Sequence, residues 1–151
     1  MIRLLIPILF CFKVVAVNAQ IEMAAPAQWN TIGELKTLGL TKAKMEFRSL
    51  GSDTIYFLLM KDFRKQQETN YFSVKFNGTG NTFSQLYELL QSFFLAENRK
   101  DKDYMKTFRL GEEGVNLQHC NLIGQHGVRL TTKEGYINLS EKDVDKLFGK
   151  R

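Results

Sequence analysis

The chain has few cysteines: there are two in 151 residues, Cys11 and Cys120. Cys11 lies in an N-terminal segment that we expect to be removed, so Cys120 would remain alone and an intramolecular disulfide is excluded. A domain without this cross-link depends on its hydrophobic core. The 12 Phe and 5 Tyr residues indicate that this core is rich in aromatic contacts.

The chain also lacks a strong excess of one charge. It has 21 Lys and Arg against 16 Asp and Glu, and without Arg3 and Lys13 the balance is 19 against 16, or +3. Basic and acidic residues alternate along most of the sequence. A nucleic-acid binder normally carries a basic patch or stripe, so nucleic acid is not an expected partner.

No hydrophobic run is long enough to form a permanent membrane span, which takes about 20 apolar residues. Residues 4–17 are apolar except for Lys13, Arg3 precedes them, and Val17-Asn18-Ala19 places small side chains at a cleavage position. This pattern predicts a signal peptide over residues 1–19, cleaved before Gln20. We therefore expect a secreted protein, either periplasmic or extracellular.

Strong catalytic, nucleotide and metal motifs are missing. One Cys and two His are too few for a closed metal site, and no cofactor motif is present. Cys120 and His126 are the candidate catalytic residues, because a thiolate nucleophile needs a nearby base. His119 is adjacent to Cys120, and adjacent strand residues point to opposite faces. We favour Cys120 as a small buried hydrophobe and keep a thiol-dependent enzyme as the alternative.

The mature chain divides into a leader over residues 20–41 and an α+β domain over residues 42–151. Thr31-x-x-Glu34 has the form of a capping box, and Ile32, Leu35 and Leu38 recur at helical spacing. These features predict a short helix within the leader.

The first half of the domain has the period of strands. Apolar and charged residues alternate over residues 43–48, turn residues follow, and residues 54–60 are continuously apolar. This predicts a hairpin whose second strand is more buried than its first, and alternation over residues 71–77 predicts a third strand.

One long amphipathic helix follows. Thr82-x-x-Gln85 has the form of a second capping box, and apolar residues recur at spacings of three and four from Phe83 to Phe94. Residues 97–106 are charged and predict a solvated loop. Further strands are expected over residues 107–110, 115–119, 128–132 and 136–139, with an irregular segment over 121–127. Ser140-x-x-Asp143 predicts the start of a short C-terminal helix.

The predicted fold is α+β: a single domain, mainly antiparallel sheet in the order β-β-β-α-β-β-β-β-α, with the long helix on one face. We expect six residues to be mostly buried: Phe57, Leu59, Phe76, Leu86, Leu90 and Phe93.

The predicted function is that of a small exported, non-catalytic interaction or ligand-binding domain, whose partner is a protein or a small ligand. Two surfaces are candidates for binding. One is the segment of residues 61–70. The other is the polar strand face that carries Lys44, Glu46, Arg48, Ser73 and Lys75.

Overall fold

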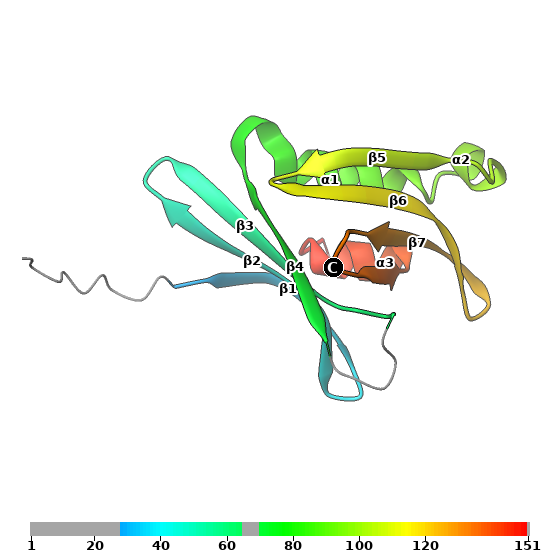
Figure 1. The fold of residues 1–151 in the computed structure, drawn as a ribbon, viewed down its shortest axis with the longest axis horizontal. Helices are drawn as coiled ribbons and strands as arrows, with labels where there is room; N and C mark the ends of the chain where they lie inside the picture. The colour runs from blue at the N-terminus through cyan, green and yellow to red at the C-terminus, as the bar shows by residue number, and fades with distance from the viewer. Residues whose placement is uncertain (1–27, 65–69, 151) are drawn as a thin grey trace, which may run out of the picture.

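The computed structural model describes residues 28–64 and 70–150. Two four-stranded antiparallel sheets, each in sequence order, make up the protein (Figure 1). The first sheet contains β1 (Asn30–Thr37), β2 (Leu40–Leu50), β3 (Asp53–Lys61) and β4 (Tyr71–Asn77). The second sheet contains β5 (Met105–Leu110), β6 (Glu113–Leu122), β7 (Gln125–Thr131) and β8 (Tyr136–Leu139).

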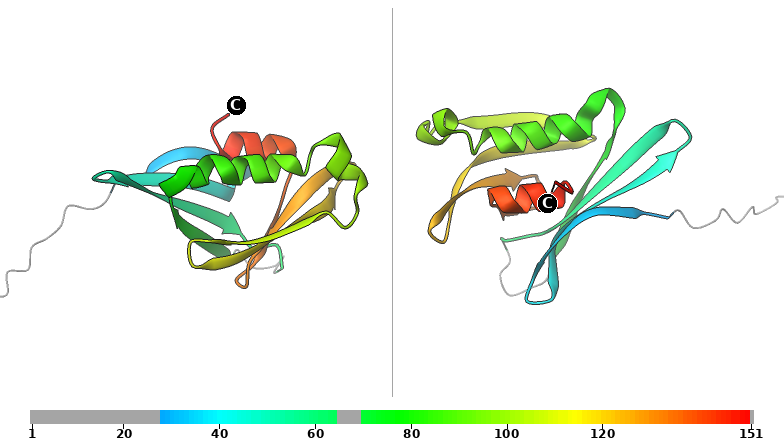
Figure 2. Two further views of the ribbon diagram at one scale, coloured as in Figure 1. Left: turned by 90° about the horizontal axis from the view of Figure 1, so that it is seen from above. Right: turned by 180° about the vertical axis from the view of Figure 1, so that it is seen from behind.

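The helices lie together on one side of both sheets. They are η1 (Thr79–Asn81), α1 (Thr82–Ser92), α2 (Ala96–Lys100) and α3 (Glu141–Leu147). Figure 2 shows α1 and α3 side by side, with the sheets on their other side. The Tyr87 hydroxyl and the Gln91 side-chain amide of α1 both donate to Asp145 of α3, at 2.9 and 2.7 Å. The inner faces of both sheets and the buried sides of these helices share one hydrophobic core.

The two sheets are joined beyond the end of β3. The backbone amide of Phe63 donates to the carbonyl of Tyr136 at 3.0 Å, and the amide of Tyr136 lies 3.3 Å from Oδ1 of Asp62. Asp62 is buried and also accepts from the Arg64 amide and guanidinium. Burial alone would raise the pKa of the Asp62 carboxyl, but these donors together hold it below its ordinary value.

A second joint lies between β4 and the turn from β5 to β6. Gly111 in this turn has φ +63°, and a Cβ atom there would lie 2.1 Å from the carbonyl oxygen of Lys75. Only glycine allows both the positive φ and this close approach. The outer edge of β4 is therefore partly covered by the second sheet.

The predicted α+β fold with antiparallel strands is confirmed. Period-two alternation correctly located β2 and β4, the continuously apolar run correctly located β3, and the later strands fall close to their predicted positions. Ser140 and Asp143 form the expected capping box of α3, with the Asp143 amide donating to Ser140 Oγ at 3.2 Å. Residues 1–19 and the first part of the leader, residues 20–27, lie outside the described residues.

The predicted helix in the leader is wrong, because residues 30–37 form β1. Gly33 and Leu35 are buried in this strand, and pairing with β2 places Leu35 opposite Ala43. Leu38 and Gly39 make the turn with φ 51° and 80°. The helical spacing of three apolar residues is a weak local preference. The hydrogen bonds between β1 and β2 and the packing of α3 on β1 outweigh it. The strand order consequently has four strands, not three, before the first helix.

Three smaller predictions also need correction. Thr82 and Gln85 donate to the carbonyls of Thr79 and Gly80 and do not form a capping box. The charged segment over residues 97–106 contains α2 and the start of β5. The segment over residues 121–127 is a hairpin, in which β6 runs to Leu122, β7 begins at Gln125, and Gly124 turns the chain with φ 71°.

Candidate functional site

Strand β3 is apolar on both of its faces, although only one face belongs to the hydrophobic core. Leu58 and Met60 are buried in the core, whereas Ile55, Phe57 and Leu59 lie on the opposite face and are half-buried. Phe57 and Leu59 were predicted to be mostly buried; both are half-buried and lie outside the hydrophobic core. The other four predicted core residues are buried as expected. β3 has one exposed residue in nine and β2 has three in eleven, although each strand contains two buried residues.

The strand register arranges this outer face in three rows. Each row has an apolar residue of β3 in the centre, a charged residue of β2 on one side and a polar residue of β4 on the other. The rows are Lys44–Leu59–Ser73, Glu46–Phe57–Lys75 and Arg48–Ile55–Asn77. The polar strand face predicted from the sequence therefore exists, but it surrounds an apolar stripe. We call these nine residues, together with Trp29, the outer face.

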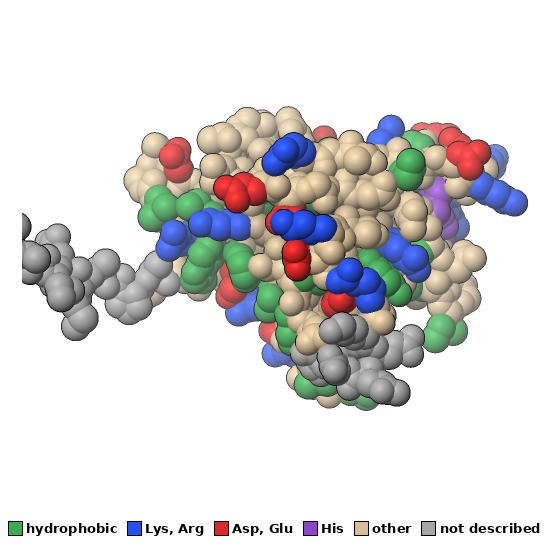
Figure 3. All heavy atoms as spheres, in the orientation of Figure 1, with side chains coloured by type: hydrophobic (Ala, Val, Ile, Leu, Met, Phe, Trp, Pro, Cys, Tyr) green, Lys and Arg blue, Asp and Glu red, His purple; other side chains and the backbone are tan. Residues whose placement is uncertain are grey.

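Trp29 enlarges the apolar stripe. Its ring lies 5.7 Å from the ring of Phe57, and the guanidinium of Arg48 lies 5.1 Å from the Trp29 ring centroid. Beside them, Lys44 and Glu46 form an ion pair at 2.5 Å. The Nε atom of Arg48 is buried and has no hydrogen-bond partner among the described residues. Figure 3 shows hydrophobic side chains of this region at the surface with Lys and Arg among them.

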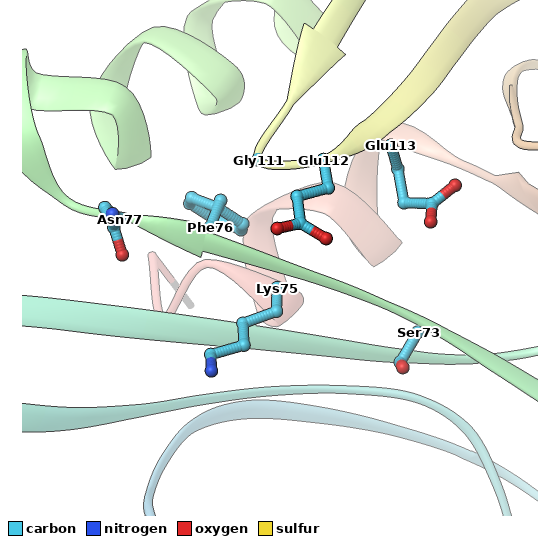
Figure 4. A pocket seen from close by; sticks show the side chains of 7 residues that line it. All are labelled: Ser73, Lys75, Phe76, Asn77, Gly111, Glu112 and Glu113. Atoms are coloured by element: carbon cyan, nitrogen blue, oxygen red, sulfur yellow. The ribbon is translucent and has the colours of Figure 1, made fainter.

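A pocket of about 390 Å³ adjoins the outer face at β4 (Figure 4). Ser73, Lys75 and Asn77 line it from β4, Glu112 from the turn between β5 and β6, and Glu113 from the start of β6. Glu113 is mostly buried: Lys133 lies 3.4 Å from its Oε1, and its Oε2 is buried without a partner among the described residues. The pocket thus presents both an ammonium group and carboxylates to a ligand that contacts the outer face.

The second predicted binding surface, residues 61–70, is described only in part, because residues 65–69 lie outside the described residues. Asp62 and Phe63 connect the two sheets, and Arg64 is 2.9 Å from Asp62 Oδ2. The described residues at the start of this segment therefore stabilise the fold.

The Cys120 and His126 pair is not arranged as a nucleophile and its base. Cys120 lies opposite Gly127 in the ladder, while His126 lies opposite Asn121, one position along. Alternation therefore places the Cys120 thiol on the other face of the strand from His119 and His126. Burial raises the pKa of the Cys120 thiol despite the charges of Arg129 and Lys42. Cys120 is half-buried, not fully buried as the sequence suggested.

Metal-binding and membrane-spanning features can be judged for residues 28–64 and 70–150. This part of the chain contains no cluster of three or more His, Cys, Asp or Glu residues that could hold a metal ion. None of its helices has the length and apolar character needed to cross a membrane. The segment from Gly78 to Thr82 forms η1 and leads into α1, as expected for a turn between a strand and a helix.

Comparison with known proteins found no match. No protein-family description, curated protein or solved structure is significantly similar to this chain.

Proposed function

We propose that this protein is an exported, non-catalytic binding domain that contacts a partner protein through the outer face of its first sheet. The observation that carries the proposal is the half-buried apolar stripe Ile55, Phe57 and Leu59 outside the core, bordered on both sides by polar residues. Protein interfaces have this organisation, with an apolar and aromatic centre and a polar rim.

The composition of the outer face favours a protein over other partners. Trp, Phe and Arg are the residue types most enriched at interface centres, and Trp29, Phe57 and Arg48 are in contact here. Nucleic acid is disfavoured because Glu46, Glu112 and Glu113 lie among the lysines and would repel phosphates. A half-buried apolar stripe is also costly in a monomer, since about 25 cal/mol per Å² is regained when its remaining surface is buried.

Export is the other part of the proposal and is supported by the signal-like pattern over residues 1–19. N-terminal sequencing of the protein recovered from the periplasm or the medium should begin at or within a residue or two of Gln20. A full-length product that remains in the cytoplasm would contradict it.

Partner binding can be tested with matched surface variants. Phe57→Asp places a charge in the centre of the outer face, whereas Ile123→Asp places the same charge at a fully exposed apolar position in the turn between β6 and β7. Cross-linking in the native exported fraction should recover the same partner with the wild type and Ile123→Asp, and lose it with Phe57→Asp. Thermal unfolding must show that both variants are folded.

The contrary result is equally clear. If folded Phe57→Asp recovers the same partner as the wild type, or if only Ile123→Asp loses it, the outer face is not the binding surface. Trp29→Ala provides a second variant, because Trp29 is at the periphery of the fold and its removal opens no core cavity.

A further inference from the structure

His119 and His126 lie together on adjacent strands at the inner face of the second sheet. Their ring centroids are 4.6 Å apart. His119 Nε2 is 2.9 Å from the carbonyl oxygen of Asn98, and His126 Nε2 is 3.1 Å from that of Phe93. A carbonyl can only accept a hydrogen bond, so Nε2 carries the proton in both rings and Nδ1 is the nitrogen left free. His119 Nδ1 has no partner among the described residues.

A cavity of about 410 Å³ adjoins this pair. Besides the two histidines, it is lined by Arg99 of α2, by Lys102 and Asn121, and by Cys120. None of these lining residues is acidic, although the neighbouring connector contains acidic residues. Figure 3 shows the His side chains at the surface beside Lys and Arg.

Arg99 and Lys102 determine the class of ligand. Both are exposed, and neither forms an ion pair with another residue that the structure describes. Two cations at one cavity repel a metal ion and attract an anion. Guanidinium and imidazolium groups donate charge-assisted hydrogen bonds to carboxylate, phosphoryl and sulfuryl oxygens.

We propose that this cavity binds a small oxyanion between Arg99, Lys102 and the two histidines. The site is separate from the outer face of the first sheet, so it does not depend on the proposed protein partner. In the complex, a proton on the free Nδ1 of His126 would be donated to the anion, and the side chains of Arg99 and Lys102 would neutralise the remaining charge.

Anion binding at this cavity should depend on pH through the protonation of His126. Burial, together with the neighbouring His119 and Arg99, lowers the pKa of His126 despite its bond to the Phe93 carbonyl. A bound anion favours the protonated ring and raises this pKa again, so binding takes up a proton and tightens as pH falls. The other groups facing the pair are Lys102 and the ring of Tyr104, which stacks on His119.

The test uses the mature protein with sulfate, whose charge is constant over the pH range of interest. The chain has only two histidines, so every imidazole NMR signal reports on this site. Sulfate should raise the apparent pKa of His126 by about 0.5 unit or more and bind more tightly near pH 5.5 than near pH 7.5. Acetate, tested in parallel, distinguishes a carboxylate preference from a sulfuryl or phosphoryl preference.

Variants within one segment provide the control. Arg99→Ala and Lys102→Ala should each weaken sulfate binding about tenfold, the effect of losing one charge-assisted hydrogen bond. Lys100→Ala removes the same charge from a neighbouring exposed position that does not line the cavity, and should change binding less than about twofold. The proposal would be overturned if all three variants weakened sulfate binding equally. It would also be overturned if neither sulfate nor acetate shifted the imidazole NMR signals near pH 5.5.

Discussion

The replacement of Gly33 by alanine tests how the C-terminal helix is held on the first sheet. Gly33 lies in β1 directly beneath the end of α3. A Cβ atom at this position would lie 2.1 Å from the carbonyl oxygen of Lys146 and 2.5 Å from that of Leu147. Both are backbone atoms, so no side-chain rotation relieves the clash. To restore the 3.4 Å of ordinary contact, the end of α3 would have to retreat by about 1.3 Å.

The cost follows from what α3 buries. Val144, Leu147 and Phe148 are at most 3% exposed, and full burial of such side chains is worth about 1.5 to 3 kcal/mol each. A gap of about 1 Å forfeits roughly a quarter to a half of the contact energy. Gly33→Ala should therefore lower the free energy of unfolding by about 1 to 4 kcal/mol.

Gly114→Ala is the matched control, because it is also a strand glycine but a Cβ atom there would meet nothing within 4 Å. It should leave stability unchanged or raise it by up to about 1 kcal/mol. Urea unfolding, followed by far-UV circular dichroism and by the fluorescence of the single tryptophan, Trp29, measures both variants. If Gly33→Ala unfolds at the same urea concentration as Gly114→Ala, α3 does not rest on β1 as described.

Three further predictions concern single side chains. Leu90→Ala should cost about 2 to 5 kcal/mol, since Leu90 is fully buried and its removal leaves a cavity; an unchanged denaturant midpoint would show that α1 does not pack on the core. Asp62→Asn should cost about 1 to 3 kcal/mol near neutral pH by weakening the hydrogen bonds to Arg64 and Tyr136. The pKa of Asp62 is lowered in the folded protein. Its contribution to stability is therefore present above the unfolded pKa of about 3.9 and is lost as pH falls through the folded pKa. A difference in stability between wild type and variant that grows on acidification would refute this role. Cys120 should react with iodoacetamide more slowly in the folded protein than after denaturation, because its raised pKa leaves little thiolate near neutral pH. Rapid native alkylation that titrates below the ordinary cysteine pKa of about 8.5 would instead support a thiol-dependent enzyme.

Most local structure could be predicted from the sequence, because it depends on residues close along the chain. Alternating polarity over residues 71–77 placed β4, and Ser140 with Asp143 marked the start of α3. Residues 31–38 were predicted wrongly because only local spacing was considered. Three apolar residues fit a helix, but long-range pairing with β2 and the contact between Gly33 and α3 favour a strand.

The candidate sites depended much more on tertiary structure. The sequence identified Lys44, Glu46 and Arg48 as one polar face, but the register was needed to show that Phe57 and Leu59 lie half-buried between them and β4. It placed His119 and His126 near each other in the chain, but not facing one another at a cavity beside Arg99.

The sequence by itself therefore determined the α+β class, the positions of most strands and helices, and which residues alternate to a common face. The strands form two sheets, one face of β3 lies outside the core, and Cys120 is separated from both histidines; these features follow from long-range packing alone. The physical reason is that periodicity reports which side chains share a face. Whether that face is buried depends on which distant helix packs against it, as α1 and α3 do on the inner side of both sheets.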